Sequence, residues 1–276
     1  MMKLGQINTL EILRETDHGV YLVDEENNEV LLPNRYVPDA FKIWDKIEVF
    51  VYLDNEERLV ATTDKPYITL GDFALLRCSA VTEYGAFLDW GLVKELFCPF
   101  KEQVFKMKPG GWYLVHCYLD EKTERLVASS KTNRFLDNKE LKVGQFDEVD
   151  IIASHPSDMG WNVIVNKIHS GLIFNDTIFN DINVGDKFKG VVKKIREGNK
   201  LDVVIGQVGY RNIEPNAKRI LEELEDNSGY INLTDKSDPE AIKEQLQMSK
   251  KSFKKAIGTL YKQKQVDLKP DGIYKL

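Results

Sequence analysis

The chain has 276 residues, of which 42% are hydrophobic and 30% charged, and its formal net charge is −6 at pH 7. This composition is ordinary for a globular protein, holds no apolar run near the roughly 18 residues that span a bilayer, and does not indicate a strongly basic nucleic-acid binder. At the N-terminus, Glu11, Arg14 and Glu15 interrupt the apolar segment that a signal peptide needs. We therefore expect a cytoplasmic protein that makes no membrane contact.

The first predicted domain, residues 1–64, holds five short segments rich in Val, Ile, Leu and Tyr. Each segment is bounded by Gly, Asp, Asn or Pro, which predicts five β-strands joined by turns. The longest connection, from Asn34 to Asp45, contains Pro38 and is expected to include one helical turn.

The second predicted domain, residues 65–138, repeats the first. Residues 52–62 read YLDNEERLVAT and residues 118–129 read YLDEKTERLVAS, while Gly19 and Gly85 open matching segments 66 residues apart. Self-similarity at a fixed period indicates the architecture of the whole chain. A period of this length exceeds those of solenoids and propellers and is typical of a small complete domain.

The third predicted domain, residues 139–209, has the same five segments in a more diverged form. Asp158-Met159-Gly160 stands where Glu83-Tyr84-Gly85 stands in the second. A five-stranded unit with a helical turn in its middle is most simply an OB-fold barrel, although another small barrel would also satisfy the pattern. The sequence thus predicts a mainly β protein with three tandem five-stranded OB-fold barrels.

The pattern changes in the last predicted domain, residues 210–276, which is expected to be α+β. Residues 215–226 place apolar side chains at a helical period. Asp238 and Pro239 are typical of the start of a second helix, and Ser249 of the start of a third. A short β segment at residues 229–233 and a hairpin turning at residues 270–272 complete a winged helix.

Charge is distributed unevenly along the chain. Residues 1–64 carry six Lys and Arg against fourteen Asp and Glu, a net charge of −8, whereas residues 65–141, 142–209 and 210–276 carry +1, −1 and +2. Because an acidic surface repels phosphate, we expect the first domain to be a spacer or a docking site for a protein partner. Residues 249–276 hold eight lysines against two aspartates.

A family resemblance rests on two stretches. Residues 83–88, Glu-Tyr-Gly-Ala-Phe-Leu, resemble the aromatic-Gly-Ala-aromatic strand of the RNA-binding domain first named in ribosomal protein S-one, and residues 125–130 resemble its closing strand. Three such repeats followed by MSKKSFKKAIGTLYK, residues 248–262, resemble the bacterial conserved virulence factor B family over essentially the whole chain. The resemblance implies RNA binding, an influence on the expression of other genes, and stacking of the two aromatics on bases.

The chain departs from the S-one pattern in two repeats. The two aromatic positions, filled by Tyr84 and Phe87 in the second repeat, are His18 and Tyr21 in the first and Met159 and Asn162 in the third. The histidine that often follows on the next strand is replaced by Phe97-Cys98-Pro99. Base stacking is therefore expected in the second repeat alone.

Tyr84 and Phe87 are the predicted stacking residues. Single strands are held by aromatic faces for the bases together with positive charge for the phosphates. On a regular strand these two side chains would point to opposite faces, so a turn or bulge at Gly85 must redirect Tyr84. In the alternative interpretation Phe87 is a core residue and Tyr84 a loop aromatic.

Two basic clusters are candidate phosphate contacts. In the third repeat, alternation places Lys187 and Lys189, with Lys193 as a further candidate, on one face of a strand, opposite Phe188 and Val192. The alternative is a strand edge at which lysine prevents aggregation. The candidates of this cluster are Lys187, Lys189, Lys193, Lys194 and Arg196.

The second basic cluster is on the third helix of the winged helix. A basic face on this helix suits phosphate contact, and Lys269 near the tip of the wing would add to it. An ordinary solvated face is the alternative, and no array of Arg or Asn for reading base edges is present. The candidates on the helix are Lys250, Lys251, Lys254 and Lys255.

The sequence predicts no catalytic, cofactor or metal site. It lacks the motifs G-x-x-x-x-G-K-[ST], G-x-G-x-x-G, H-E-x-x-H and G-x-S-x-G, and its four histidines share no ligand spacing. The three cysteines, without a C-x-x-C pair, are expected to be buried and reduced. The expected function is non-enzymatic binding of single-stranded RNA in post-transcriptional regulation; the alternatives are a DNA-binding transcriptional regulator and a protein-interaction scaffold.

Overall fold

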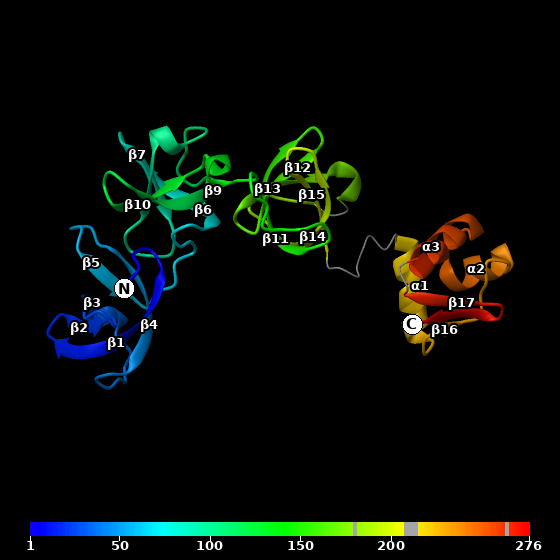
Figure 1. Cartoon of the computed structure of the whole chain (residues 1–276), viewed down its shortest axis with the longest axis horizontal. Coiled ribbons are helices and arrows are strands. Elements are labelled where there is room, and N and C mark those ends of the chain that lie inside the picture. The colour runs from blue at the N-terminus through cyan, green and yellow to red at the C-terminus, as the bar shows by residue number, and fades with distance from the viewer. Residues whose placement is uncertain (179–180, 207–214, 263–264) are drawn as a thin grey trace.

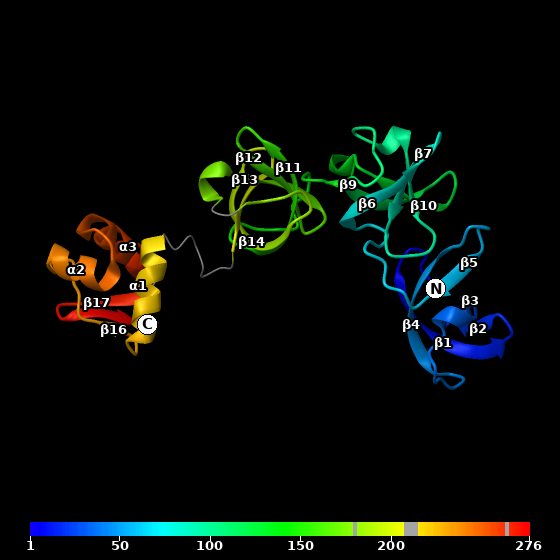
Figure 2. The ribbon, with the colours of Figure 1, turned by 180° about the vertical axis from the view of Figure 1, so that it is seen from behind.

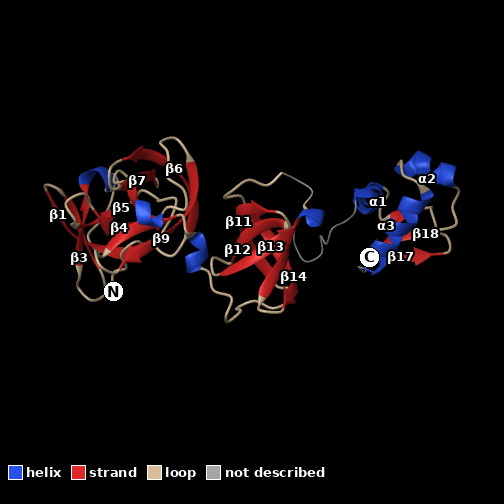
Figure 3. Ribbon diagram, turned by 90° about the horizontal axis from the view of Figure 1, so that it is seen from above, coloured by secondary structure: helices blue, strands red, loops and turns tan. Residues whose placement is uncertain are grey.

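A computed structural model describes residues 1–178, 181–206, 215–262 and 265–276. It contains three closed five-stranded barrels and, near the C-terminus, a three-stranded sheet packed with three helices (Figure 1). The view from behind shows the barrels in chain order, and the view from above shows helical structure concentrated near the C-terminus (Figures 2 and 3). The mainly β fold with a C-terminal α+β domain is confirmed.

Barrel one closes in the strand order β1-β2-β3-β5-β4. All of its neighbouring strands are antiparallel except β3 and β5, which pair in parallel. This is the five-stranded Greek-key barrel of the OB-fold. The turn expected after β3 is a 3-10 helix, Asn34–Tyr36. The strands are β1 Ile7–Thr16, β2 Gly19–Val23, β3 Glu29–Pro33, β4 Lys46–Leu53 and β5 Leu59–Thr62.

Barrels two and three have the same topology, with a parallel pairing between their third and fifth strands. The strands of barrel two are β6 Phe73–Val81, β7 Gly85–Asp89, β8 Leu96–Pro99, β9 Trp112–Asp120 and β10 Arg125–Ser129. Those of barrel three are β11 Glu148–Ser157, β12 Gly160–Val165, β13 His169–Phe174, β14 Lys187–Arg196 and β15 Lys200–Ile205.

The three barrels share one register between their second and third strands. Tyr21 pairs with Leu31, Phe87 with Phe97, and Asn162 with Leu172, at equivalent positions after the glycine that opens each second strand. That glycine is required where the chains approach closely: a Cβ on Gly19 would lie 2.1 Å from the carbonyl oxygen of Leu32. Equivalent positions can therefore be compared directly among the barrels.

The C-terminal domain consists of α1 Pro215–Asp226, α2 Pro239–Leu246, α3 Lys250–Lys262 and a sheet in the order β16-β18-β17. The strands are β16 Tyr230–Ile231, β17 Val266–Lys269 and β18 Gly272–Lys275. The Asp238 side chain accepts a hydrogen bond from the backbone N–H of Glu240, and Ser249 Oγ accepts one from Ser252. The predicted caps and the hairpin are thus confirmed.

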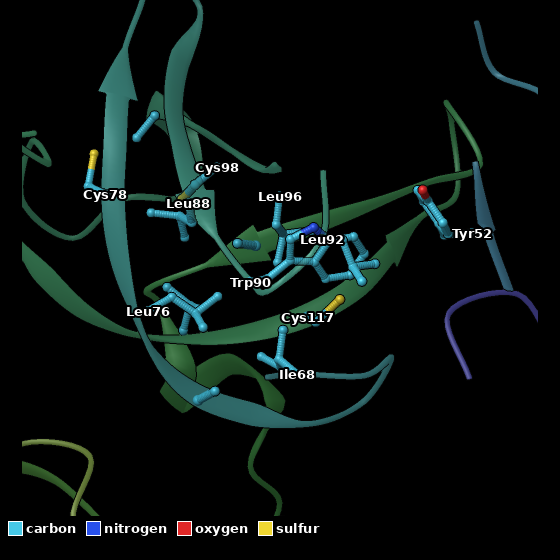
Figure 4. Close-up of a cluster of buried hydrophobic side chains, with 14 of the residues drawn as sticks. Tyr52, Ile68, Leu76, Cys78, Leu88, Trp90, Leu92, Leu96, Cys98 and Cys117 are labelled. Atoms are coloured by element: carbon cyan, nitrogen blue, oxygen red, sulfur yellow. The ribbon is translucent and has the colours of Figure 1, made fainter. Parts of the chain in front are cut away.

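The hydrophobic core of barrel two extends into barrel one, which also has a core of its own. Phe50, Tyr52 and Val60 of barrel one belong to the same buried cluster as Trp90, which follows β7 and is 2% exposed. The ring of Trp90 meets the rings of Phe50 and Tyr52 edge-on, at centroid distances of 5.6 and 6.4 Å. Figure 4 shows Trp90 and Leu92 on the side of the barrel-two core that faces Tyr52.

A second apolar contact joins barrels two and three. Phe73 and Leu114 of barrel two cluster with Ile152 and Ile164 of barrel three. Beside them, the Lys167 Nζ atom lies 2.5 Å from Asp72 Oδ1. The expected boundary between barrel three and the winged helix, at residues 209 and 210, lies outside the described residues. Among the described residues, no helix has the length and apolar character to cross a membrane.

Candidate nucleic-acid interface

The main candidate site is a groove of about 850 Å³ between barrels one and two. Barrel two supplies most of its surface through β7, β8, β10 and the segment between β7 and β8. Barrel one supplies the end of β4 and the following turn. The lining residues that can contact a ligand through polar or aromatic groups include Tyr52, Asn55, Tyr84, Phe87, Lys94, Phe97 and Arg125.

The aromatic surface of the groove is built on two neighbouring strands. Phe87 on β7 and Phe97 on β8 are cross-strand partners, with ring centroids 5.2 Å apart and planes inclined by 44°. Both rings are half-buried, so each keeps an accessible surface. A pair of rings at this spacing presents a face on which a base can stack.

Tyr84 reaches the same groove from the turn before β7. Its side chain is 72% exposed. The turn is held by hydrogen bonds from the backbone N–H of Thr82 to the Gly85 carbonyl and from the N–H of Tyr84 to Thr82 Oγ1. Because Tyr84 precedes the strand, strand alternation does not apply to it, and the turn required by the sequence analysis is present. The structure therefore brings Tyr84 and Phe87 together.

Two cations border the aromatic surface. Arg125 is exposed at the start of β10 and forms an ion pair with Glu57 of barrel one. Lys94 Nζ donates a hydrogen bond of 2.7 Å to the backbone carbonyl of Asp54. Burial lowers the pKa of Lys94. Asp89 and Glu95 also line the groove, so its charge is mixed.

Sequence reasoning did not assign Phe97, Lys94 or Arg125 to the site. Phe97 stands where the S-one pattern has a histidine, and Arg125 opens the repeated closing strand. The register of β7 on β8 would have placed Phe97 beside Phe87. The contribution of Asn55 and Tyr52 depends on how two barrels pack, which a single repeat does not encode.

In the structure, acidic side chains lie beside the basic cluster of barrel three and offset part of its charge. Lys187 and Lys189 line a groove of about 460 Å³ between barrels two and three, together with Asp72 and Asp150. The Lys189 Nζ atom lies 2.6 Å from Asp150 Oδ1. The strand-edge alternative is wrong because β14 pairs with both β11 and β15 in a closed barrel.

The alternation expected along β14 breaks at a bulge. The register shifts between Val192 and Lys194, so Lys193 and Lys194 are both exposed. Arg196 instead donates from Nε to Asp202 Oδ1 at 2.8 Å, and its guanidinium lies 5.6 Å from the centroid of the Phe174 ring. Since Asp202 is buried, Arg196 is committed to a structural ion pair.

Helix α3 presents its basic face as expected. Lys251, Lys254 and Lys255 are exposed, Lys250 is half-buried, and Phe253 lies buried between them. Lys254 Nζ is 3.9 Å from Asp235 Oδ2, and Lys250 Nζ donates to the Lys236 carbonyl at 3.4 Å. On the wing, Lys269 is exposed with its Nζ 4.3 Å from the centre of the Tyr274 ring. No interaction joins the barrel-two groove to α3 among the described contacts.

The cysteines are free and buried, as the sequence predicts. Burial raises the pKa of the Cys98 and Cys117 thiols to about 12, which leaves them protonated and unreactive. Within the described ranges, no group of three or more His, Cys, Asp or Glu side chains is placed to hold a metal ion.

Two family models match the chain. One, described as an S1 domain, matches residues 4–64, which is barrel one, and the other, a CvfB-like winged helix domain, matches residues 218–274. A Bacillus subtilis (strain 168) protein named YitL is 28% identical over 95% of this chain and 90% of its own length. Conserved virulence factor B of Staphylococcus aureus (strain USA300) is 25% identical over 96% of this chain and 91% of its own. The chain is thus similar to conserved virulence factor B over nearly its full length.

The resemblance found in the sequence is therefore confirmed over nearly the full length. A solved structure from Streptococcus pneumoniae, titled a multidomain protein with nucleic acid binding domains, covers 99% of this chain and 98% of its own at 23% identity and a TM-score of 0.41. S1 and winged-helix domains are nucleic-acid-binding domain types, and this chain combines both kinds.

Proposed function

We propose that this protein binds single-stranded RNA without changing it chemically and thereby regulates the expression of other genes after transcription. The observation that carries the proposal is the groove of barrel two, where the Phe87–Phe97 pair and Tyr84 lie beside Arg125. Aromatic faces next to positive charge hold unpaired nucleotides in OB-fold proteins. A duplex keeps its bases stacked inside, so such a surface favours a single strand.

The regulatory part of the proposal is supported by homology to the conserved virulence factor B proteins. Binding of a transcript by several weak sites on one chain gives useful avidity, because linked sites face a high effective concentration of the same strand. Helix α3 would supply a second, largely electrostatic contact through Lys251, Lys254 and Lys255.

The test is a titration of the purified protein into labelled single-stranded RNA and into duplex DNA of equal length, at several salt concentrations. We expect tighter binding to the RNA and a linear fall of log affinity with log salt. Preference for duplex DNA would favour a transcriptional regulator acting through α3. Absence of salt-sensitive binding to either nucleic acid would favour a protein-interaction scaffold and contradict the proposal.

A double variant separates the contribution of α3. Lys251→Gln with Lys254→Gln should lower the slope of the salt dependence by about 1.4, since each phosphate contact on a single strand contributes roughly 0.7. The matched control is Lys218→Gln with Lys243→Gln, an equal change of charge at exposed positions on α1 and α2. Equal slopes for the two double variants would show that α3 has no special role.

A further inference from the structure

The acidic barrel one reaches directly into the candidate groove of barrel two. Its turn between β4 and β5, residues 54–58, contributes Asn55 to the lining of the groove. The turn is well defined: Asp54 Oδ1 accepts hydrogen bonds from the backbone N–H groups of Glu56 and Arg58, at 2.8 and 3.0 Å. Lys94 of barrel two holds the turn from the other side through the Asp54 carbonyl.

Glu57 extends from this turn to the Arg125 guanidinium. Both partners are about half exposed, at 57% and 51%, so water and ions reach the pair. Arg125 is also the one arginine among the residues that line the groove in the described structure. The ion pair of Arg125 with Glu57 competes with binding of a phosphate by Arg125, because the guanidinium fork binds either a carboxylate or a phosphate bidentately.

The hydrophobic cluster that spans the two barrels holds the turn of barrel one beside the groove. Trp90 packs between barrel two and the rings of Phe50 and Tyr52, so the turn cannot move far from the groove without opening buried apolar surface. The carboxylate of Glu57, on a flexible side chain, can leave Arg125 without any movement of the barrels. An exposed ion pair costs little to break.

We propose that barrel one forms one wall of the nucleotide-binding groove and that Glu57 occupies Arg125 until a phosphate of a bound single strand displaces it. This proposal rests on the proposed function. Barrel one is then neither a spacer nor only a docking domain, since its acidic turn lowers the affinity of the barrel-two groove for single strands that cannot displace Glu57. A single-stranded nucleic acid must place a phosphate at Arg125 and a base at Phe87 and Phe97 at the same time for the displacement of Glu57 to be favourable in free energy.

The test uses the full chain, a labelled oligouridylate of about 12 nucleotides, and fluorescence anisotropy at low salt. Glu57→Gln should raise affinity about two- to fivefold, the range that corresponds to an exposed ion pair. The matched control is Glu56→Gln, which removes the same charge from the next residue of the turn but pairs with Arg58, at 2.9 Å, instead of Arg125. The control should raise affinity by clearly less.

A double-mutant cycle completes the experiment. Arg125→Ala should weaken binding, and Glu57→Gln in that background should add no more than Glu56→Gln does. Equal effects of Glu57→Gln and Glu56→Gln, or a gain from Glu57→Gln that persists without Arg125, would overturn the exchange while leaving RNA binding intact. Absence of binding by the unchanged protein would overturn the proposed function, and this proposal with it. Thermal unfolding of each variant confirms that the fold is retained.

Discussion

Barrel two and barrel three have the same strand order and the same register, yet they offer different chemistry at equivalent positions. Where barrel two pairs Phe87 with Phe97, barrel three pairs Asn162 with Leu172. Barrel two has aromatic faces beside few cations, whereas barrel three has many cations and, among its described residues, no aromatic ring pair. Several of the barrel-three cations are also neutralised, as Lys189 is by Asp150.

The difference shows that a repeated backbone does not by itself repeat a function. Closing the barrel requires the inward-facing apolar residues and the glycine of the second strand, and all three repeats keep these. The outward-facing pair is free to vary because the fold does not depend on it. Site residues must therefore be assigned barrel by barrel.

The largest expected effect is on stacking in barrel two. Phe87→Leu should weaken binding to single-stranded RNA by as much as about 100-fold, since stacking on an aromatic ring is worth roughly 1–3 kcal/mol per base. The matched control is Tyr21→Leu at the equivalent position of barrel one. The Arg14 guanidinium covers that ring at 4.2 Å from its centroid, so little change is expected there. Equal losses in anisotropy titrations of the two variants would remove the distinction between the barrels.

The contact between barrels two and three should be sensitive to acid. His116 is 7% exposed, its ring lies 4.4 Å from that of Phe73 and 4.0 Å from that of Phe135, and burial lowers its pKa to about 4. In the unfolded chain His116 takes up a proton as the pH falls below its ordinary pKa of about 6.5. In the folded chain His116 stays neutral down to about pH 4. Stability should therefore fall, by on the order of 2 kcal/mol, as pH drops from about 6.5 to about 4.

Denaturant unfolding at a series of pH values measures this loss. His116→Phe, which cannot titrate, should show a flatter profile across the same window, whereas His18→Phe, at an exposed position of barrel one, should not. A profile for His116→Phe that coincides with that of the unchanged protein would mean that other groups cause the acid sensitivity.

The smallest expected effect concerns the basic strand of barrel three. Lys189→Gln should change RNA affinity by less than about twofold, because Asp150 already compensates its charge and exposed pairs of this kind are weak. Lys193→Gln, at the exposed bulge, should have the larger effect on the same salt-dependent titration. A loss of more than about fivefold for Lys189→Gln would restore β14 as a phosphate-binding strand.

The fold was largely predictable because each of its signals is local. Short apolar segments bounded by turn residues marked the strands, and Asp238, Pro239 and Ser249 marked the starts of α2 and α3. The bulge at Lys193 was not predictable, since the pairing of a strand with two neighbours decides where its register shifts. The closed barrel likewise depends on contacts between distant segments.

The candidate site was predictable only in part. Tyr84 and Phe87 stood out because residues 83–88 resemble the aromatic-Gly-Ala-aromatic strand of the S-one domain and only the second repeat keeps both aromatics. The roles of Asn55, Glu57 and Arg125 depend on the packing of two barrels against each other, and no property of either repeat alone indicates it. Charge counts were misleading for Arg196, because they do not show that Asp202 lies beside it.

Trp90 has a consequence for how this protein can be rearranged. The equivalent position in barrel one is Asp24, whose carboxylate accepts hydrogen bonds from a surface turn and from the Met2 backbone N–H, so the tryptophan is not needed to close a barrel. A recombination that moved barrel two alone into another protein would carry an indole with no Phe50 or Tyr52 to cover it, and uncovered apolar surface of that kind promotes aggregation. The unit that can be transferred intact is therefore the pair of barrels.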